Sequence, residues 1–341
     1  MDPRQARRTA IWRRVSFAMA LVLVLGVSYL AVVGYQGSLL FAARARAGDC
    51  RTPESAFGWS YEAINYDIST DRDLAPFKDR THCPHQGQVA GTGLTASDGI
   101  RIAGWYVPAA EKVGPTAPTV VLAHADGKNK SEMLAWAAML HATYNLVLFD
   151  FRNHGQSSGD VTTLGVREVR DMRAVVDWVK AAKGPTSIAL LGVSMGGAAA
   201  IGEAASDPRV AAVILDSTHA TLANAIQARL ERDGYPLALP GAWSILLGGL
   251  LRTGEDMSAA DPVQAIGRYG NRPVLIVAAG NDQAVGPNDP ADLLAAARAD
   301  GAGAELKTCP GAAHAKSIET CSAQYAGWVL GFLERSRPRA P

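Results

Sequence analysis

The most informative segment of the chain is Ser187-Ile-Ala-Leu-Leu-Gly-Val-Ser-Met-Gly-Gly-Ala-Ala-Ala200. It opens with a short apolar run, Ile188 to Leu191, of the kind that a buried parallel strand shows, and it closes with an Ala-rich stretch of good helix propensity. Between them lies G-x-S-x-G, from Gly192 to Gly196, in which a tight, strained turn exposes a serine hydroxyl above the sheet. The glycines fit because side chains there would collide where strand and helix approach each other. The segment predicts a strand, a turn that presents Ser194 as a nucleophile, and a helix.

Length and composition indicate a globular domain and a separate apolar segment. The 341 residues can bury a full core, in one large domain or in two. The 33 basic and 32 acidic residues nearly cancel, so that no electrostatic attraction to nucleic acid is implied and we expect no such partner. A hydrophobic content of 48% with 19% charged residues fits an α/β domain combined with a membrane segment.

The apolar segment lies near the N-terminus. Residues 15–43 contain no charged side chain and are long enough to cross a bilayer as a helix. Five arginines precede them: Arg4, Arg7, Arg8, Arg13 and Arg14. By the positive-inside rule, we expect residues 1–14 to form a cytoplasmic basic tail, residues 15–43 a transmembrane anchor, and the rest to lie outside the cytoplasm. The alternative is a signal peptide cleaved at Ala45-Arg46-Ala47, but the apolar run exceeds the usual signal core and ends well before Ala47.

Residues 48–92 read as a linker or N-terminal extension, because Asp, Ser, Pro and Gly are frequent in them. His82-Cys83-Pro84-His85 resembles half of a metal site, but no second ligand pair follows at metal-binding spacing. We therefore expect no metal, and a loop with a bridged cysteine instead.

From Gly93 to residue 337, strand-like runs alternate with helical patterns. The Asp98-Gly99 turn predicts a hairpin over Leu94–Val107. Further strands are expected at residues 119–123, 146–149, 188–191, 210–215, 274–277 and 305–308, and helices at 131–141, 169–179 and 323–334. This order predicts an α/β fold with a mostly parallel sheet flanked by helices, which places ligands at the carboxyl ends of the strands.

Four motifs give the chain its resemblance to a known family. They are D-G-I-R-I-A-G-W-Y-V-P from Asp98, V-V-L-A-H from Val120, F-D-F-R-N-H-G-Q-S-S-G from Phe149, and G-V-S-M-G from Gly192. Residues 93–337 resemble serine hydrolases of the α/β-hydrolase fold, in the branch of dienelactone-hydrolase-like and serine-aminopeptidase-like proteins. The resemblance implies a triad in the order Ser, acid, His, and it says little about the substrate.

The histidine and the acid of the triad come after Ser194 in that order. His314 lies in the small-residue loop that follows the last strand, where such proteins carry the catalytic histidine. His219 follows a strand directly and comes too early. Asp282, after the strand at 274–277, is the favoured acid, and Asp216, at the end of the preceding strand, is the alternative.

The oxyanion hole requires two backbone N–H groups. Met195 is expected to supply one and Asp126 the other, although a carboxylate at position 126 opposes an oxyanion unless it points away. Asp150, Arg152 and His154 match the resemblance too, and we expect them to brace loops.

The insertion at about residues 220–260 is the expected helical cap. Its uncharged segment, Leu237 to Leu251, predicts a helix packed on the domain, with a lipid-facing lid as the alternative. If the segment lines the entrance to the site, it favours an acyl or otherwise apolar group on the substrate.

The chain has four cysteines, all in the part predicted to lie outside the cytoplasm, where disulfides persist. Local closure favours the pairs Cys50–Cys83 and Cys309–Cys321, of which the second brackets the His314 loop.

These expectations combine into a membrane-anchored, exported serine hydrolase. Ser194 would attack a carboxylic ester, thioester or amide of a small-molecule or acyl substrate, with no metal or organic cofactor. The alternatives are a peptidase that uses the same triad and a non-catalytic, membrane-anchored binding protein with a hydrolase fold.

Overall fold

The computed structural model describes residues 3–42, 50–64, 93–110 and 117–337. Its strands are β1 (Glu62–Ile64), β2 (Gly104–Val107), β3 (Thr119–Ala123), β4 (Asn145–Phe149), β5 (Ile188–Val193), β6 (Val210–Asp216), β7 (Val274–Ala279) and β8 (Ala304–Cys309). Its longer helices are α1 (Pro3–Ser38), α3 (Leu134–Leu140), α4 (Glu168–Lys183), α5 (Met195–Ala204), α6 (Leu222–Arg232), α7 (Ala238–Thr253), α9 (Asp289–Ala299) and α11 (Ser322–Arg335). Short helices are α2 (Pro53–Phe57), α8 (Pro262–Ile266), α10 (Ser317–Thr320) and the 3₁₀ turns η1 (Leu39–Ala42), η3 (Lys130–Met133) and η4 (Met257–Ala260).

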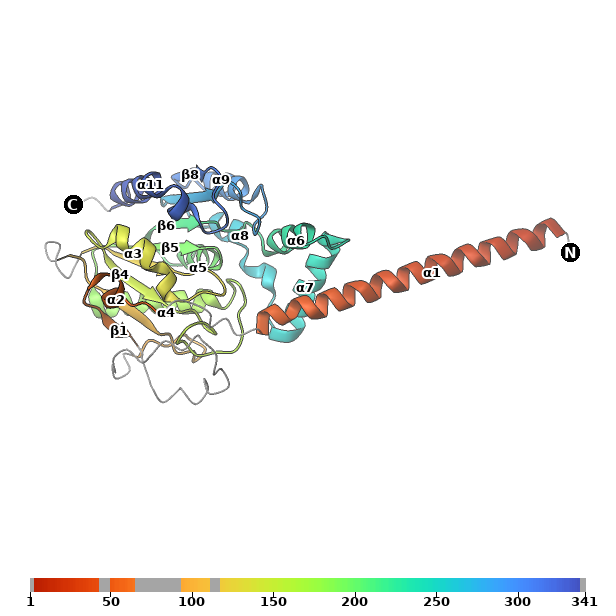
Figure 1. Cartoon of the computed structure of the whole chain (residues 1–341), viewed down its shortest axis with the longest axis horizontal. Coiled ribbons are helices and arrows are strands. Elements are labelled where there is room, and N and C mark those ends of the chain that lie inside the picture. Colours follow the sequence, from red (N-terminus) through yellow and green to blue (C-terminus); the bar gives the residue numbers. More distant parts are fainter. Residues whose placement is uncertain (1–2, 43–49, 65–92, 111–116, 338–341) are drawn as a thin grey trace.

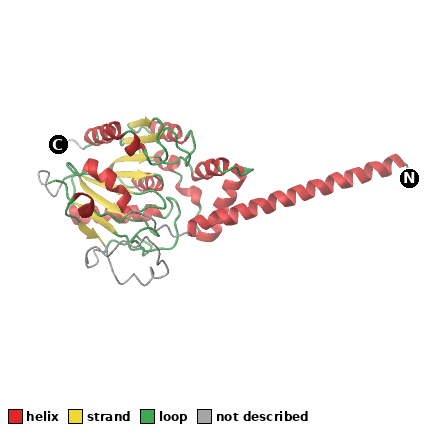
Figure 2. Cartoon of the chain, viewed as in Figure 1, coloured by secondary structure: helices red, strands yellow, loops and turns green. Residues whose placement is uncertain are grey.

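The strands form one sheet in the order β1-β2-β4-β3-β5-β6-β7-β8, with helices on both sides (Figure 2). From β4 to β8 all neighbours run parallel, whereas β1 and β2 add an antiparallel edge. The predicted mostly parallel α/β sheet is therefore confirmed. The six strands predicted after residue 118 all form, and β3 matches its predicted range at both ends.

The antiparallel edge differs from the prediction in two ways. β1 lies inside residues 48–92, which were predicted as a linker, and it pairs with β2 over three residues. The expected hairpin over 94–107 is reduced to one bridge between Thr95 and Arg101, around a turn in which Gly99 has φ +84°. Instead, β2 pairs with β1 and β4. In this position Trp105 and Tyr106 of β2 are buried in the sheet.

Two apolar layers follow from the alternation of side chains along the strands. Val121, Leu190 and Ile276 face one layer, together with helices α4, α5, α8 and α9. Leu122, Leu191 and Val277 face the other, together with α3 and α11. Since both faces are covered, the open part of the sheet is its carboxyl edge, where Ser194 follows β5.

A third apolar cluster joins the insertion to the N-terminal helix. Residues of α6 and α7 pack with the end of α1 and with η1; the buried members include Val33, Phe41, Leu230, Ile245 and Leu246. Figure 1 shows α1 leaving the globular part next to α7 and extending far beyond it. Within the described residues, one helical stretch, Ile11–Ala42, is long and apolar enough to cross a membrane, and it is exposed along most of its length.

Candidate active site

Ser194 stands in a backbone conformation that few residues adopt. It lies between β5 and α5 with φ 54° and ψ −116°, and its hydroxyl is turned toward the loops beyond the sheet. The glycines around it are required by close contacts. A Cβ on Gly192 would collide with the carbonyl of Gly196, and a Cβ on Gly196 would collide with the carbonyl of Ala123. The sequence therefore folds locally as a tight strand–turn–helix element.

The structure brings Ser194, His314 and Asp282 together although they are far apart in the sequence. His314 Nε2 lies 2.9 Å from Ser194 Oγ, and His314 Nδ1 lies 2.8 Å from Asp282 Oδ2. The other oxygen of Asp282 accepts the backbone N–H groups of Ala284, at 2.8 Å, and Val285, at 3.3 Å. These bonds fix the carboxylate, so that it can hold the imidazole with Nδ1–H toward Asp282 and the Nε2 lone pair toward the hydroxyl.

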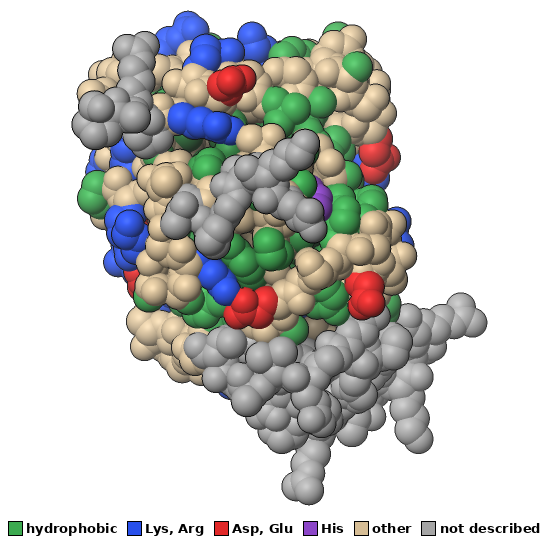
Figure 3. Space-filling model, turned by 90° about the vertical axis from the view of Figure 1, so that its left-hand side faces the viewer, with side chains coloured by type: hydrophobic (Ala, Val, Ile, Leu, Met, Phe, Trp, Pro, Cys, Tyr) green, Lys and Arg blue, Asp and Glu red, His purple; other side chains and the backbone are tan. Residues whose placement is uncertain are grey.

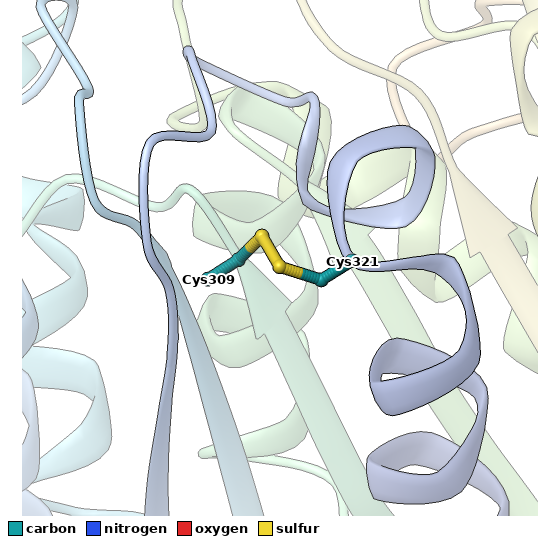
Figure 4. The surroundings of a disulfide bond; sticks show 2 residues. All are labelled: Cys309 and Cys321. Carbon is teal, nitrogen blue, oxygen red and sulfur yellow. A yellow bond between two sulfur atoms is a disulfide. The ribbon is translucent and has the colours of Figure 1, made fainter.

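The loop that carries His314 is closed by a disulfide. Cys309, at the end of β8, is bonded to Cys321, just before α11 (Figure 4). The predicted Cys309–Cys321 pair is therefore confirmed. Cys83 lies outside the described residues, so the Cys50–Cys83 pair stays a prediction. The bridge joins the two ends of the histidine loop, one at the end of β8 and the other at the start of α11.

Asp216, the alternative acid, does not bond to His314 in the described site. Its carboxylate accepts hydrogen bonds from the Tyr325 hydroxyl, at 2.7 Å, and the Ser217 hydroxyl, at 3.0 Å. Burial raises the pKa of Asp216 to about 6, although these two bonds and the nearby His314 act in the opposite direction. The geometry therefore favours Asp282 as the partner of the histidine.

The sequence analysis did not predict the hydrogen-bond network around Asp216. Trp136 Nε1 donates to the Tyr325 hydroxyl at 2.7 Å, and the backbone N–H of Ala315 donates to Ser217 Oγ at 3.1 Å. Asp216 thus connects the buried core to the residue next to His314. Tyr325 lies in the helix predicted at residues 323–334, but no pattern along the chain indicates which group a buried hydroxyl bonds to.

Met195 and Asp126, the two expected oxyanion donors, belong to the start of α5 and to the loop after β3. Met195 begins α5, and the first N–H groups of a helix have no partner within it. The loop after β3 lies against this helix start, because Gly196 is in close contact with the carbonyls of Ala123 and His124. The Asp126 carboxylate, whose charge was expected to oppose an oxyanion, is hydrogen-bonded to His154 Nε2 at 3.2 Å.

Neighbouring polar groups hold these loops, in agreement with the bracing role expected for Asp150, Arg152 and His154. Buried Asp150 accepts the backbone N–H and the ammonium group of Lys130. Arg152 bonds to Asp171 and Asp98. Burial lowers the pKa of His154, but the hydrogen bonds to Asp126 and to the Arg152 carbonyl outweigh it and raise the net pKa.

Two further groups lie near the site: Glu132, which the sequence analysis did not single out, and His219, which it set aside as the triad histidine. Glu132 accepts the N–H of Ala125 at 3.1 Å, and burial raises the pKa of this carboxyl. His219 is buried, and burial together with the charge of nearby His314 lowers its pKa to about 4, which keeps His219 neutral at pH 7. Across the described ranges, no three His, Cys, Asp or Glu side chains are grouped so that they could hold a metal ion.

Comparison with known proteins identifies the fold. The family model of the alpha/beta hydrolase fold matches residues 118–272, which include Ser194. The esterase Pf2001 of Pyrococcus furiosus superposes with a TM-score of 0.65 over 87% of this chain and 99% of its own, at 19% identity. The chain has the α/β-hydrolase fold. Another protein of this fold, Est1E from Butyrivibrio proteoclasticus with ferulic acid bound, superposes with a TM-score of 0.53 over 70% of this chain and 97% of its own, at 20% identity.

Two relatives found by sequence are described as uncharacterized proteins. YfhR of Escherichia coli O157:H7 is 29% identical over 168 residues, which cover 47% of this α/β-hydrolase-fold chain and 57% of YfhR. MT2364 of Mycobacterium tuberculosis is 29% identical over 244 residues, which cover 70% of this chain and 78% of MT2364. The chain thus matches little more than half the length of YfhR. The fold and its esterase neighbours support hydrolase activity.

Proposed function

We propose that the protein is a membrane-anchored serine hydrolase that cleaves carboxylic esters, thioesters or amides through an acyl-enzyme on Ser194. The observation that carries the proposal is the continuous hydrogen-bonded chain from Ser194 Oγ through His314 to Asp282 at the carboxyl edge of the sheet. A serine hydroxyl alone is a weak nucleophile, and a histidine that is itself held by a carboxylate is what activates it.

The proposed reaction follows from these positions. Ser194 Oγ attacks the carbonyl carbon while His314 Nε2 takes its proton, and Asp282 stabilises the imidazolium that forms. The backbone N–H groups of Met195 and Asp126 receive the oxyanion of the tetrahedral intermediate. His314 then donates its proton to the leaving group, and a water molecule, deprotonated by the same nitrogen, releases the acyl group.

An ester is the favoured substrate class among the three. The esterase Pf2001 and the ferulic acid complex of Est1E share the fold, and the cap brings apolar side chains of α6 and α7 close to the catalytic domain. A peptidase would require a pocket for a charged peptide terminus.

We propose that α1 is the membrane anchor and that the catalytic domain lies outside the cytoplasm. The length of the apolar helix and the arginines before it support this orientation. The Cys309–Cys321 bond supports it as well, because disulfides persist in oxidising compartments.

Labelling with a fluorophosphonate tests the catalytic proposal. The wild-type protein should be labelled and should hydrolyse p-nitrophenyl esters, and Ser194→Ala should lose both properties while its melting temperature is unchanged. Ser336→Ala is the matched control, because it removes a serine hydroxyl at the end of α11, outside the site, and should behave as wild type. An unlabelled but folded wild-type protein would instead identify a binding protein, and a preference for peptide amides over esters would identify a peptidase.

A further inference from the structure

Helix α7 is apolar on both sides, but only one side is covered by protein. Ala242, Ile245, Leu246 and Gly249 are buried against the rest of the cap and the end of α1. On the other side, the α7 apolar face consists of side chains four residues apart, with exposed fractions of 49%, 53%, 56% and 80%: Leu239, Trp243, Leu247 and Leu251. A helix that is apolar all round belongs in a core or in a membrane.

The exposed apolar surface continues onto neighbouring segments. Tyr235 and Leu237 are exposed just before α7, and Tyr35 and Leu40 are exposed at the end of the N-terminal helix. No charged residue lies between Asp233 and Arg252. The end of the molecule opposite α1 differs, since Lys, Arg, Asp and Glu side chains are spread over it (Figure 3). An apolar patch of this extent marks a site of interaction with a protein or a membrane.

Helix α7 lies in close contact with α1. A Cβ on Gly34 would come within 2.7 Å of the Ser244 carbonyl, and a Cβ on Gly248 within 2.6 Å of the Gly34 carbonyl. Ser244 Oγ donates to the carbonyl of Leu30 at 2.6 Å, and the Tyr29 hydroxyl donates to the carbonyl of Pro236 at 2.8 Å. Small residues and hydroxyl bonds of this kind are typical of helix pairs in membranes.

The end of the N-terminal helix is fixed to the catalytic domain rather than joined to it by a flexible tether. Phe41 of η1 is buried in the cap cluster, and its carbonyl accepts the N–H of Thr162 at 2.9 Å. Arg252 Nε donates to Ser38 Oγ at 3.3 Å. The position of α7 relative to α1 therefore sets its position relative to any bilayer that α1 spans.

The contacts place α7 at the level of the outer membrane–water interface. About 20 helical residues cross the hydrocarbon core of roughly 30 Å, and residues 15–34 provide that length without a charge. α7 touches α1 and η1 from Tyr29 to Phe41, which covers the last turns of the span and the residues beyond it. Trp243 and Tyr35 are exposed there, and Trp and Tyr are enriched at such interfaces.

We propose that the α7 apolar face is embedded in the interfacial layer of the bilayer that α1 spans, so that the cap rests on the phospholipid surface. This inference rests on the proposed anchor. The occupant is lipid because the face is continuous with the surface of the spanning helix, and because moving four large apolar side chains from water into lipid is favourable.

A fluorescent probe on the full-length protein in phosphatidylcholine liposomes tests the proposal. NBD is attached to one introduced cysteine at a time, with Leu251→Cys and Leu247→Cys as test positions. Val24→Cys in α1 is the positive control, and Lys180→Cys in α4 is the exposed, soluble control. The wild-type chain serves as the labelling blank. NBD at 247 and 251 should show blue-shifted emission that is quenched by lipids brominated in their acyl chains, whereas NBD at 180 should show neither effect.

The outcomes separate this proposal from the anchor. Quenching at 24 together with water-like emission at 247 and 251 would overturn the docking of α7 and leave the anchor intact. Absence of quenching at 24 would overturn the anchor and the docking together. Blue-shifted emission at 251 without quenching by brominated lipid would mean that protein, a partner or a second copy, covers the face, and this result would also overturn the proposal.

Discussion

The choice between Asp282 and Asp216 gives the sharpest test of the site, because the same Asp→Asn change should have opposite consequences at the two positions. In Asp282→Asn, the backbone N–H groups of Ala284 and Val285 should hold the amide oxygen where Oδ1 now lies. The amide NH₂ would then replace Oδ2, 2.8 Å from His314 Nδ1. The amide oxygen, 3.0 Å from Nδ1, would remain as an acceptor, but the closer NH₂ group would oppose an Nδ1–H and favour the tautomer with the proton on Nε2, where His314 can no longer accept one from Ser194.

The expected loss in kcat for Asp282→Asn is about 10³–10⁴-fold, the size that the wrong histidine tautomer produces in serine hydrolases, or roughly 4–5 kcal/mol of transition-state stabilisation. Asp216→Asn should lower kcat by less than about tenfold, since Asp216 is bonded to Tyr325 and Ser217 and not to the imidazole. It should instead lower the free energy of unfolding by roughly 1–3 kcal/mol, because one buried hydroxyl loses its acceptor.

The assay is steady-state hydrolysis of a short p-nitrophenyl ester by the two detergent-solubilised variants, with the melting temperature of each measured in parallel. Each variant is the control for the other, as both remove one charge from neighbouring strand ends. A larger loss of kcat in Asp216→Asn, at equal folded fraction, would refute the assignment of Asp282.

Three further predictions concern stability and topology. Double replacement of Cys309 and Cys321 by serine opens a loop with a sequence separation of 12 residues, so thermal unfolding should show a loss of roughly 3 kcal/mol, and turnover should also fall; unchanged melting would contradict this. Because burial raises the folded pKa of Asp216 from its ordinary value of 3.8 to about 6, the free energy of unfolding should fall as the pH rises from about 4 to 6, and denaturant titrations should show a weaker fall over this range in Asp216→Asn. A reporter fused after Pro341 should be active only outside the cytoplasm, whereas soluble release with a new N-terminus near Gly48 would indicate a signal peptide.

The central strands were predictable because each is an uninterrupted run of apolar residues, the pattern of a strand that is buried on both faces. β3, β5 and β7 are short apolar runs buried on both faces, and the residue that follows each of them is polar or a glycine: His124, Ser194 and Gly280. The elbow was predictable from the G-x-S-x-G motif. Gly192 contacts Gly196 within the turn itself, whereas Gly196 contacts Ala123 of the adjacent strand β3.

What the sequence did not predict depends on long-range contacts. β1 has three residues, and its partners in β2 lie 40 to 44 residues further along the chain: Ile64 pairs with Gly104, and Glu62 pairs with Tyr106. The bond from Tyr325 to Asp216 spans 109 residues. Periodicity indicates that a side chain is buried, but the partner of its polar atom is decided only when distant elements meet.

The uncharged segment of the insertion had two interpretations, a helix packed on the domain and a lipid-facing lid, and the structure is compatible with both. α7 is packed on the protein through one face and exposed through the other. The same insertion reaches the site, since Arg232 at the end of α6 donates to the carbonyl of Gln283 at 2.9 Å and Asn224 donates to Asp289 at 3.0 Å. Gln283 directly follows Asp282. One helical unit therefore contacts the N-terminal helix on one side and the loop of the proposed catalytic acid on the other, so seating the cap on a membrane would also constrain the loop that orients His314.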